Sequence, residues 1–78
     1  MKPEAVTTVD APAAIGPYSQ AIICGSMVFL SGQIPLDPAS GKIVGKTVAE
    51  QTERVLKNLT GVLRACRLEM KHIVKTTV

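Results

Sequence analysis

The pattern of apolar and polar positions predicts a small β-sheet in the first part of the chain. A β-branched run over residues 5–9 predicts a first strand, which turn-forming residues end. Two further apolar runs, residues 18–24 and 27–31, are separated by Gly25 and Ser26. Because glycine at the first position of a two-residue loop is typical of a type II′ turn, we predict that these runs form a β-hairpin.

An amphipathic helix is predicted to follow a structured loop. Residues 35–42 contain two prolines together with Asp, Ser and Gly, a density of turn formers that excludes a strand or helix there. Thr47 and Glu50 have the spacing of a capping box, so the helix is predicted to begin at this point. Over the next twenty or so residues, the apolar positions fall on one face. That face consists of Val48, Val55, Leu56, Leu59, Val62, Leu63 and Cys66.

The opposite face of this helix is charged. Its spacing predicts two ion pairs, Glu50 with Arg54 and Glu53 with Lys57, and it also carries Arg64 and Arg67. Gly61 lies on the polar side of the helix and costs about 1 kcal/mol relative to alanine. The sequence alone gives no reason for this glycine.

The end of the chain is predicted to be a strand. Residues 72–78 are mainly β-branched and contain no turn former. A strand, a helix and a second strand make a crossover unit, whose strands are normally parallel. One helix covers only one face of a sheet, while the hairpin strands are apolar on both faces. We therefore expect an oligomer, because bare apolar sheet faces favour association.

Composition and charge limit the classes of protein to consider. The 78 residues allow one small domain, and 46% hydrophobic residues are too many for a disordered tail. The net charge is +3, with six bases and one acid in residues 54–78. Most of these bases belong to the solvated helix face, and with only two aromatic residues there is little to stack on bases, so we expect no nucleic-acid partner.

The cysteines and the N-terminus indicate a cytoplasmic protein without a membrane span. Cys24 and Cys66 are too few for a disulfide framework and have no metal-ligand spacing. The first residues lack the apolar segment of a signal peptide, and the longest apolar stretch, residues 21–30, is too short to cross a bilayer.

The residues themselves offer little evident chemistry. No metal-binding, phosphate-binding or nucleophile motif is present. Cys24 and His72 could form a thiolate pair, but no third residue is available to orient the histidine. Cys66 lies on the apolar helix face and is interpreted as core. Tyr18 follows Gly-Pro at a strand start, where it is either an amphipathic packing residue or a site residue.

Three spaced motifs together resemble the RidA family, also called YjgF. They are AAIGPYSQA at residues 13–21, FLSGQIP at residues 29–35 and DPASG at residues 37–41. The segments TVAEQT at residues 47–52 and IVKTTV at residues 73–78 also look like the family's. The resemblance covers nearly the whole chain, so we expect residues 1–78 to be a single RidA-like domain, incomplete at its C-terminus.

The resemblance implies a fold, an assembly and a reaction. The fold would be α+β and chorismate-mutase-like, assembled as a homotrimer with the sheets inside and ligand clefts between subunits. Members hydrolyse enamine or imine acids, such as 2-iminopropanoate and 2-iminobutanoate, to 2-oxo acids and ammonia, without a metal or organic cofactor. By the motifs, Tyr18 would line the cleft, with Ser31 and Gly32 forming the adjoining wall. These three are the predicted substrate-binding residues.

The resemblance also implies what lies outside this sequence. The family's carboxylate-binding arginine, its water-positioning glutamate and a site cysteine would follow residue 78, so we assign no catalytic residue within this chain. Family members also carry the labels translation initiation inhibitor and endoribonuclease L-PSP, which leaves a non-catalytic ligand-binding or RNA-acting role as the alternative. Arg67 stands where the family frequently has glycine, and we expect the helix end to differ there.

Overall fold

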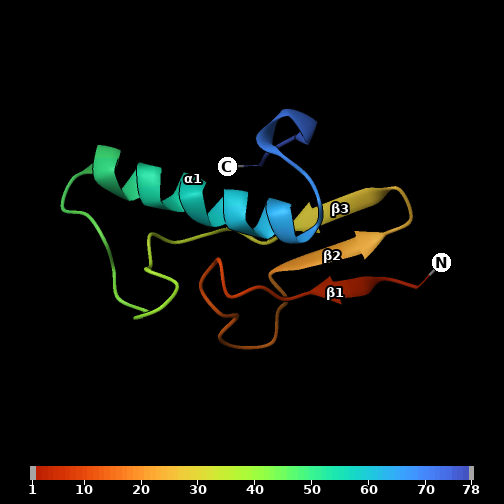
Figure 1. Cartoon of the computed structure of the whole chain (residues 1–78), viewed down its shortest axis with the longest axis horizontal. Coiled ribbons are helices and arrows are strands. Elements are labelled where there is room, and N and C mark those ends of the chain that lie inside the picture. Colours follow the sequence, from red (N-terminus) through yellow and green to blue (C-terminus); the bar gives the residue numbers. More distant parts are fainter. Residues whose placement is uncertain (1, 78) are drawn as a thin grey trace.

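The computed structural model describes residues 2–77 and has an α+β architecture (Figure 1). Strands β1 (Glu4–Val6), β2 (Ala21–Cys24) and β3 (Met27–Leu30) form an antiparallel sheet in the order β1-β2-β3. Helix α1 (Val48–Ala65) lies across one face of this sheet, and a short 3-10 helix, η1 (Met70–His72), follows it. A loop closed by one antiparallel bridge, between Leu36 and Ile43, connects β3 to α1 and confirms the predicted structured loop.

The predicted hairpin is present with its predicted turn. Cys24 pairs with Met27, so the two strands are joined by a two-residue loop. Gly25 has a φ of 62°, while Ser26 lies outside the left-handed region. Positive φ at the first loop residue only is the arrangement of a type II′ turn. Both strands are shorter than predicted, although the ladder continues beyond them through a 3.0 Å hydrogen bond from the Ser31 amide to the Gln20 carbonyl.

The first strand is also shorter than predicted, and its end has an identifiable cause. It covers Glu4–Val6 rather than residues 5–9. At Thr8 the main chain no longer pairs with a neighbouring strand. Instead, its amide donates to Oε1 of Gln20 (2.7 Å), and its carbonyl accepts from Nε2 of Gln20 (3.1 Å). A side-chain amide thus replaces the strand partner and lets the chain turn away.

Helix α1 begins where the capping residues predict. The Glu50 amide donates to Oγ1 of Thr47 at 3.1 Å, as expected. The Glu50 carboxylate differs from the prediction, because it accepts from the Thr47 hydroxyl (3.1 Å) instead of reaching back to the main chain. One of the predicted ion pairs also forms, between Glu53 and Lys57 at 3.4 Å.

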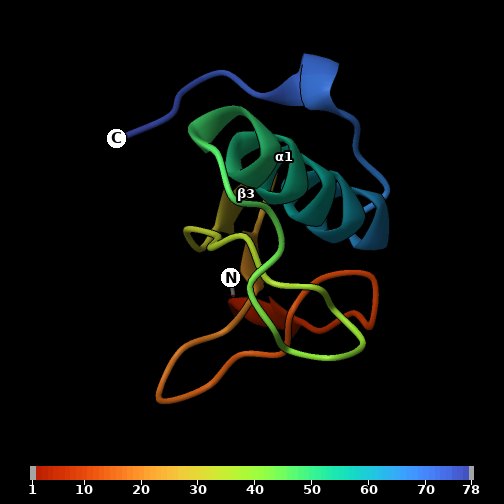
Figure 2. The same cartoon turned by 90° about the vertical axis from the view of Figure 1, so that its left-hand side faces the viewer.

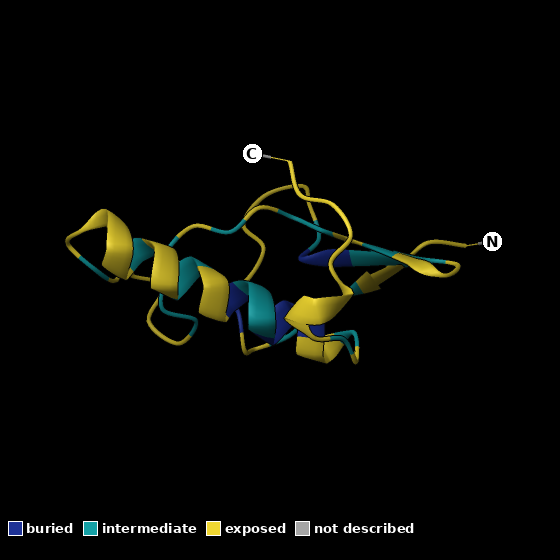
Figure 3. Cartoon of the chain, turned by 90° about the horizontal axis from the view of Figure 1, so that it is seen from above, coloured by how far each residue is buried: buried dark blue, intermediate teal, exposed yellow. Residues whose placement is uncertain are grey.

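The hydrophobic core lies under the C-terminal half of α1. Val62 packs there with Ala11 and Ala21, and Val28 and Leu30 of β3 border this cluster. Figure 3 shows that burial is concentrated where this half of the helix crosses the sheet. The predicted apolar face is only partly used, since Val48 and Leu56 remain 82% and 45% exposed.

The lengths of the elements explain these exposed positions. An 18-residue helix is about 27 Å long, whereas a four-residue strand extends only about 13 Å. The N-terminal half of α1 therefore projects beyond the hairpin, as Figure 1 shows.

The end of α1 does not differ in the way that the resemblance suggested. Arg67 adopts a φ of 61°, the left-handed conformation that suits glycine. The Leu68 amide donates to the Leu63 carbonyl (2.8 Å), and the Arg67 amide donates to the Arg64 carbonyl (2.9 Å). These two bonds make a Schellman motif, so the helix ends as it would with glycine.

The strand predicted at residues 72–78 is not formed. His72 belongs to η1, the described residues 73–77 make no strand pairing, and Val78 lies outside the described residues. The predicted parallel crossover is therefore absent from residues 2–77. The segment runs over α1 on the side away from the sheet (Figure 2), where no strand edge is available to it. A β-branched sequence needs such a partner, because β-propensity depends on context.

One face of the sheet is bare, as the sequence predicted. Ile22 pairs with Phe29, and Cys24 pairs with Met27, so these four side chains share the face opposite α1. Phe29 and Met27 are each more than half exposed, at 55% and 54%. Among the described residues, no helix is long and apolar enough to span a bilayer.

Candidate functional site

The structure brings the segments of Tyr18 and Ser31 together at one end of the hairpin. The Ser31 hydroxyl donates to the Ser19 carbonyl, and the Ser31 amide donates to the Gln20 carbonyl at 3.0 Å. Both N–H and O–H of Ser31 are therefore engaged within the chain. Toward a ligand, the Ser31 oxygen can only accept a hydrogen bond.

Tyr18 is held by its main chain and leaves its side chain accessible. Gly16 adopts a φ of 103°, which only glycine tolerates readily, and its carbonyl accepts from the Tyr18 amide at 2.9 Å. With Pro17 between them, this turn fixes the direction in which the chain enters β2. Tyr18 is 50% exposed, which argues against a packing role within the described chain.

Gly32 follows Ser31 and has no evident reason within the chain to be glycine. A Cβ at this position would meet no atom within 4 Å, and the φ of Gly32 is not in the left-handed region. Neither the φ of this residue nor the packing of the described residues requires that position 32 lack a side chain. A glycine at such an open position leaves the main chain accessible to the close approach of another group.

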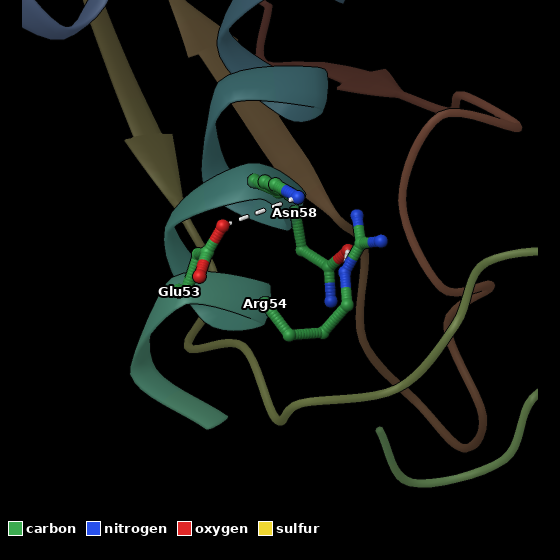
Figure 4. A network of polar contacts seen from close by, with 4 residues as sticks. Glu53, Arg54 and Asn58 are labelled. Carbon is green, nitrogen blue, oxygen red and sulfur yellow. Dashed lines mark hydrogen bonds and ion pairs between the residues drawn. The ribbon is translucent and has the colours of Figure 1, made fainter. Parts of the chain in front are cut away.

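Two buried amide side chains flank these residues, and the sequence analysis missed both. Gln20 is 2% exposed and Asn58 is fully buried. Asn58 donates from Nδ2 to the carbonyls of Ile34 (3.2 Å) and Leu36 (3.0 Å). Its Oδ1 accepts from Nε of Arg54 at 3.1 Å (Figure 4).

A signal for Asn58 was present in the sequence. It lies three residues after Val55 and four before Val62, so it is a polar residue within the apolar face of α1. A polar side chain at such a position needs hydrogen-bond partners, which the Ile34 and Leu36 carbonyls supply. The predicted Glu50–Arg54 ion pair does not form within residues 2–77, since Arg54 turns to Asn58 instead.

The charged side of α1 borders a groove that contains none of the predicted site residues. This groove has a volume of about 700 Å³ and is lined by three acids and three bases, together with apolar and small residues. The charged residues are Asp10, Asp37, Glu53, Arg54, Lys57 and Arg64. The opposite charges balance, so the groove favours neither an anion nor a cation.

The structure separates the candidate thiolate pair. Cys24 faces away from α1 on the bare sheet face, whereas His72 belongs to η1 on the other side of the helix. Nδ1 of His72 accepts from the Glu69 amide at 2.9 Å. Cys66 packs against the core cluster as predicted, and burial raises the pKa of its thiol.

Comparison with known proteins decides the family. The sequence model of the Endoribonuclease L-PSP family matches residues 8–78. The chain belongs to this family. Among its relatives is the Arabidopsis thaliana protein Reactive Intermediate Deaminase A, chloroplastic, which is 50% identical over the whole chain and of which the chain covers 42%. The human 2-iminobutanoate/2-iminopropanoate deaminase is 45% identical over 94% of the chain, which covers 53% of that protein. The resemblance to RidA is thereby confirmed.

The fold of this L-PSP/RidA family member agrees with solved structures. A crystal structure of a Thermotoga maritima protein aligns with a TM-score of 0.89 and 53% identity, covering 95% of this chain and 57% of the other. The expected RidA-like α+β fold is thus confirmed. The chain spans 42% to 60% of the length of three curated relatives that it matches.

Proposed function

We propose that this chain supplies one wall of a site at which the whole protein hydrolyses 2-imino acids. The substrates would be 2-iminopropanoate and 2-iminobutanoate, and the products the 2-oxo acids and ammonia. The observation that carries this proposal is Gly32, where an added Cβ would meet no atom of the described chain and which follows Ser31, whose hydroxyl donates to the Ser19 carbonyl. The names of the human and Arabidopsis relatives supply the reaction class.

The geometry suits the nitrogen end of an imine or enamine. Such a substrate presents an N–H, and the Ser31 oxygen is left as an acceptor because its proton is held by the Ser19 carbonyl. Gly32 leaves room for the flat substrate to approach the main chain. The exposed Tyr18 phenol provides a second polar group at the same end of the hairpin.

In the reaction, water adds to the imine carbon, and the C–N bond then breaks as the nitrogen leaves as ammonia. By the family resemblance, the arginine that binds the substrate carboxylate and the glutamate that positions the water would come from residues beyond position 78. Residues 18, 31 and 32 would orient the nitrogen relative to that water, which is a contribution of positioning. No metal or organic cofactor is part of this proposal.

A homotrimer in the cytoplasm completes the proposal. Ile22, Cys24, Met27 and Phe29 form an apolar face that α1 does not cover, and a second copy of the chain would bury it. Replacing Phe29 by lysine should dissociate the assembly, as measured by sedimentation equilibrium. A matched change on the outer helix face, Lys57→Glu, should leave the assembly intact. A wild-type protein that sediments as a monomer would refute this part of the proposal.

The activity is tested with an imine that a second enzyme generates in the assay mixture. A pyridoxal-phosphate dehydratase acting on serine releases 2-iminopropanoate, and the appearance of pyruvate is followed with and without the purified whole protein. We expect the wild-type protein to shorten the half-life of the imine. Tyr18→Phe should reduce this effect by a modest factor, and Thr52→Ala, on the exposed helix surface, should not reduce it. An unchanged half-life with the wild-type protein would refute the function.

A second candidate is RNA binding, which one observation favours. Arg64, Arg67 and Lys75 are exposed, and in residues 2–77 none of them has a carboxylate partner within ion-pair distance. The description of the family as endoribonuclease L-PSP agrees with such a role. Binding of this kind weakens steeply as salt increases. An affinity for RNA that does not change between low and physiological salt, or no affinity at all, would exclude it.

A further inference from the structure

Gln20 and Asn58 are the two fully buried polar side chains among the described residues, and they make the same kind of hydrogen bonds. Each is a primary amide whose N–H groups donate to main-chain carbonyls of an irregular segment. Buried amides of this kind fix the segments they bind, because breaking a bond would leave carbonyls without a donor. The two segments concerned adjoin the two parts of the proposed wall.

Gln20 fixes the segment that leads to Tyr18. Its Nε2 donates to the carbonyls of Pro12 (2.7 Å), Ala11 (3.3 Å) and Thr8 (3.1 Å). Its own main chain continues from Ser19, whose carbonyl holds the Ser31 hydroxyl. The loop that begins at residue 11 is therefore anchored to the start of β2, two residues from Tyr18.

Asn58 fixes the segment that follows Gly32. Its two hydrogen bonds to the Ile34 and Leu36 carbonyls tie this segment to the middle of α1. Figure 4 shows Arg54 lying beside Asn58 on the same helix, where its Nε donates to Oδ1 of Asn58. This third bond determines which end of the amide faces the carbonyls.

We propose that Gln20 and Asn58 are positioning residues of the ligand site, one for each part of the wall. Gln20 fixes the position of the main chain on the Tyr18 side of the wall. Asn58 fixes the main chain on the side formed by Ser31 and Gly32. Neither touches the ligand. This inference rests on the proposed function, since it concerns the affinity of the same site.

The test compares affinity with stability in the whole protein. The probe is 2-oxobutanoate, a product of the proposed reaction, titrated against the amide resonances of residues 31–33. Gln20→Glu and Asn58→Asp keep the size of each side chain, but an ionised carboxylate has no N–H to donate and turns a negative charge toward the carbonyls. We expect each to raise the Kd by about fivefold or more, the equivalent of one lost hydrogen bond.

A core variant separates positioning from general destabilisation. Val62→Ala opens a cavity beside Ala11 and Ala21 but removes none of the hydrogen bonds of the two amides, so it loosens the packing next to the Ala11 carbonyl without removing its donor. It should lower the denaturant midpoint while changing the Kd by less than about twofold. If Gln20→Glu and Asn58→Asp raise the Kd no more than Val62→Ala does, the inference is wrong.

A milder pair of variants keeps the test decisive if an amide variant does not fold. Arg54→Met removes the bond that orients Asn58 but leaves its two carbonyl bonds, and it should weaken binding by about twofold to threefold. Lys57→Met removes a neighbouring cation from the same helix and should leave the Kd unchanged. Equal Kd values for these two variants would overturn the role of Asn58. A wild-type protein that does not bind 2-oxobutanoate would instead refute the proposed function itself.

Discussion

The carbonyl of Asp10 lies against the backbone of Gly61. A Cβ added to Gly61 would stand 2.3 Å from the Asp10 oxygen and 2.9 Å from its carbonyl carbon. The glycine that the helix pattern left unexplained is therefore required by packing, because the loop after β1 approaches α1 more closely than any side chain permits. This contact brings the segment that Gln20 anchors onto the helix.

Gly61→Ala should destabilise the protein although alanine favours helices. Alanine gains about 1 kcal/mol in helix propensity, but the clash with the Asp10 main chain forces the loop and helix apart and costs about 1–3 kcal/mol. We expect a net loss, measured as a lower midpoint of urea unfolding. Thr52→Ala, at an exposed position of α1, should raise the midpoint slightly. A Gly61→Ala protein more stable than wild type would contradict the close packing of Asp10.

Arg67→Gly should stabilise the protein. Arg67 has a φ of 61°, so glycine relieves a conformational cost of about 1 kcal/mol while the Schellman hydrogen bonds remain. Arg64→Gly is the matched control, since it removes the same charge from a helical residue and should destabilise by up to about 1 kcal/mol. Thermal unfolding should show a higher melting temperature than wild type for Arg67→Gly and a lower one for Arg64→Gly. Destabilisation by both would show that the left-handed end of α1 is not formed.

The loop between β3 and α1 should lose stability at low pH through Asp37. The Ser40 main-chain amide donates to the Asp37 carboxylate at 2.8 Å, and this hydrogen bond, helped by the Ser40 side chain, lowers the pKa of Asp37 below its usual value of 3.8. A lowered folded-state pKa gives stability that is present above the unfolded pKa and is lost as the pH falls through the folded one. The loss should therefore occur below about pH 4.

Asp37→Asn tests this pH dependence. The variant should be less stable than wild type at pH 6, and the difference should shrink as the pH falls from about 4 to 2. Asp10→Asn is the control, since the Asp10 carboxylate accepts no hydrogen bond from the described residues. A difference between wild type and Asp37→Asn that stays constant over this range would show that the Asp37 carboxylate does not hold the loop.

Local sequence signals predicted the elements that local interactions determine. Gly25 correctly predicted the hairpin turn, and Thr47 correctly predicted the start of α1, because both signals act on residues no more than four positions away. The prediction of a strand at residues 72–78 was wrong because a strand depends on a distant partner edge, which residues 73–77 do not find here.

The candidate site was predictable only in part. The motifs drew attention to Tyr18, Ser31 and Gly32, and the structure brings the segments of Tyr18 and Ser31 together. The roles of Gln20 and Asn58 could not be predicted, since they depend on carbonyls 8 to 24 residues away in the sequence. The same holds for Gly61, whose requirement comes from the loop at Asp10.

Gly32→Ala provides the most direct test of the central claim, because the claim gives this glycine a role outside the fold. Its Cβ would meet no atom of the described chain, so the variant should unfold at the wild-type midpoint or slightly above it. In the same samples, the half-life of 2-iminopropanoate should be shortened by wild type and hardly affected by Gly32→Ala. A stable Gly32→Ala protein that is as active as wild type would contradict the account.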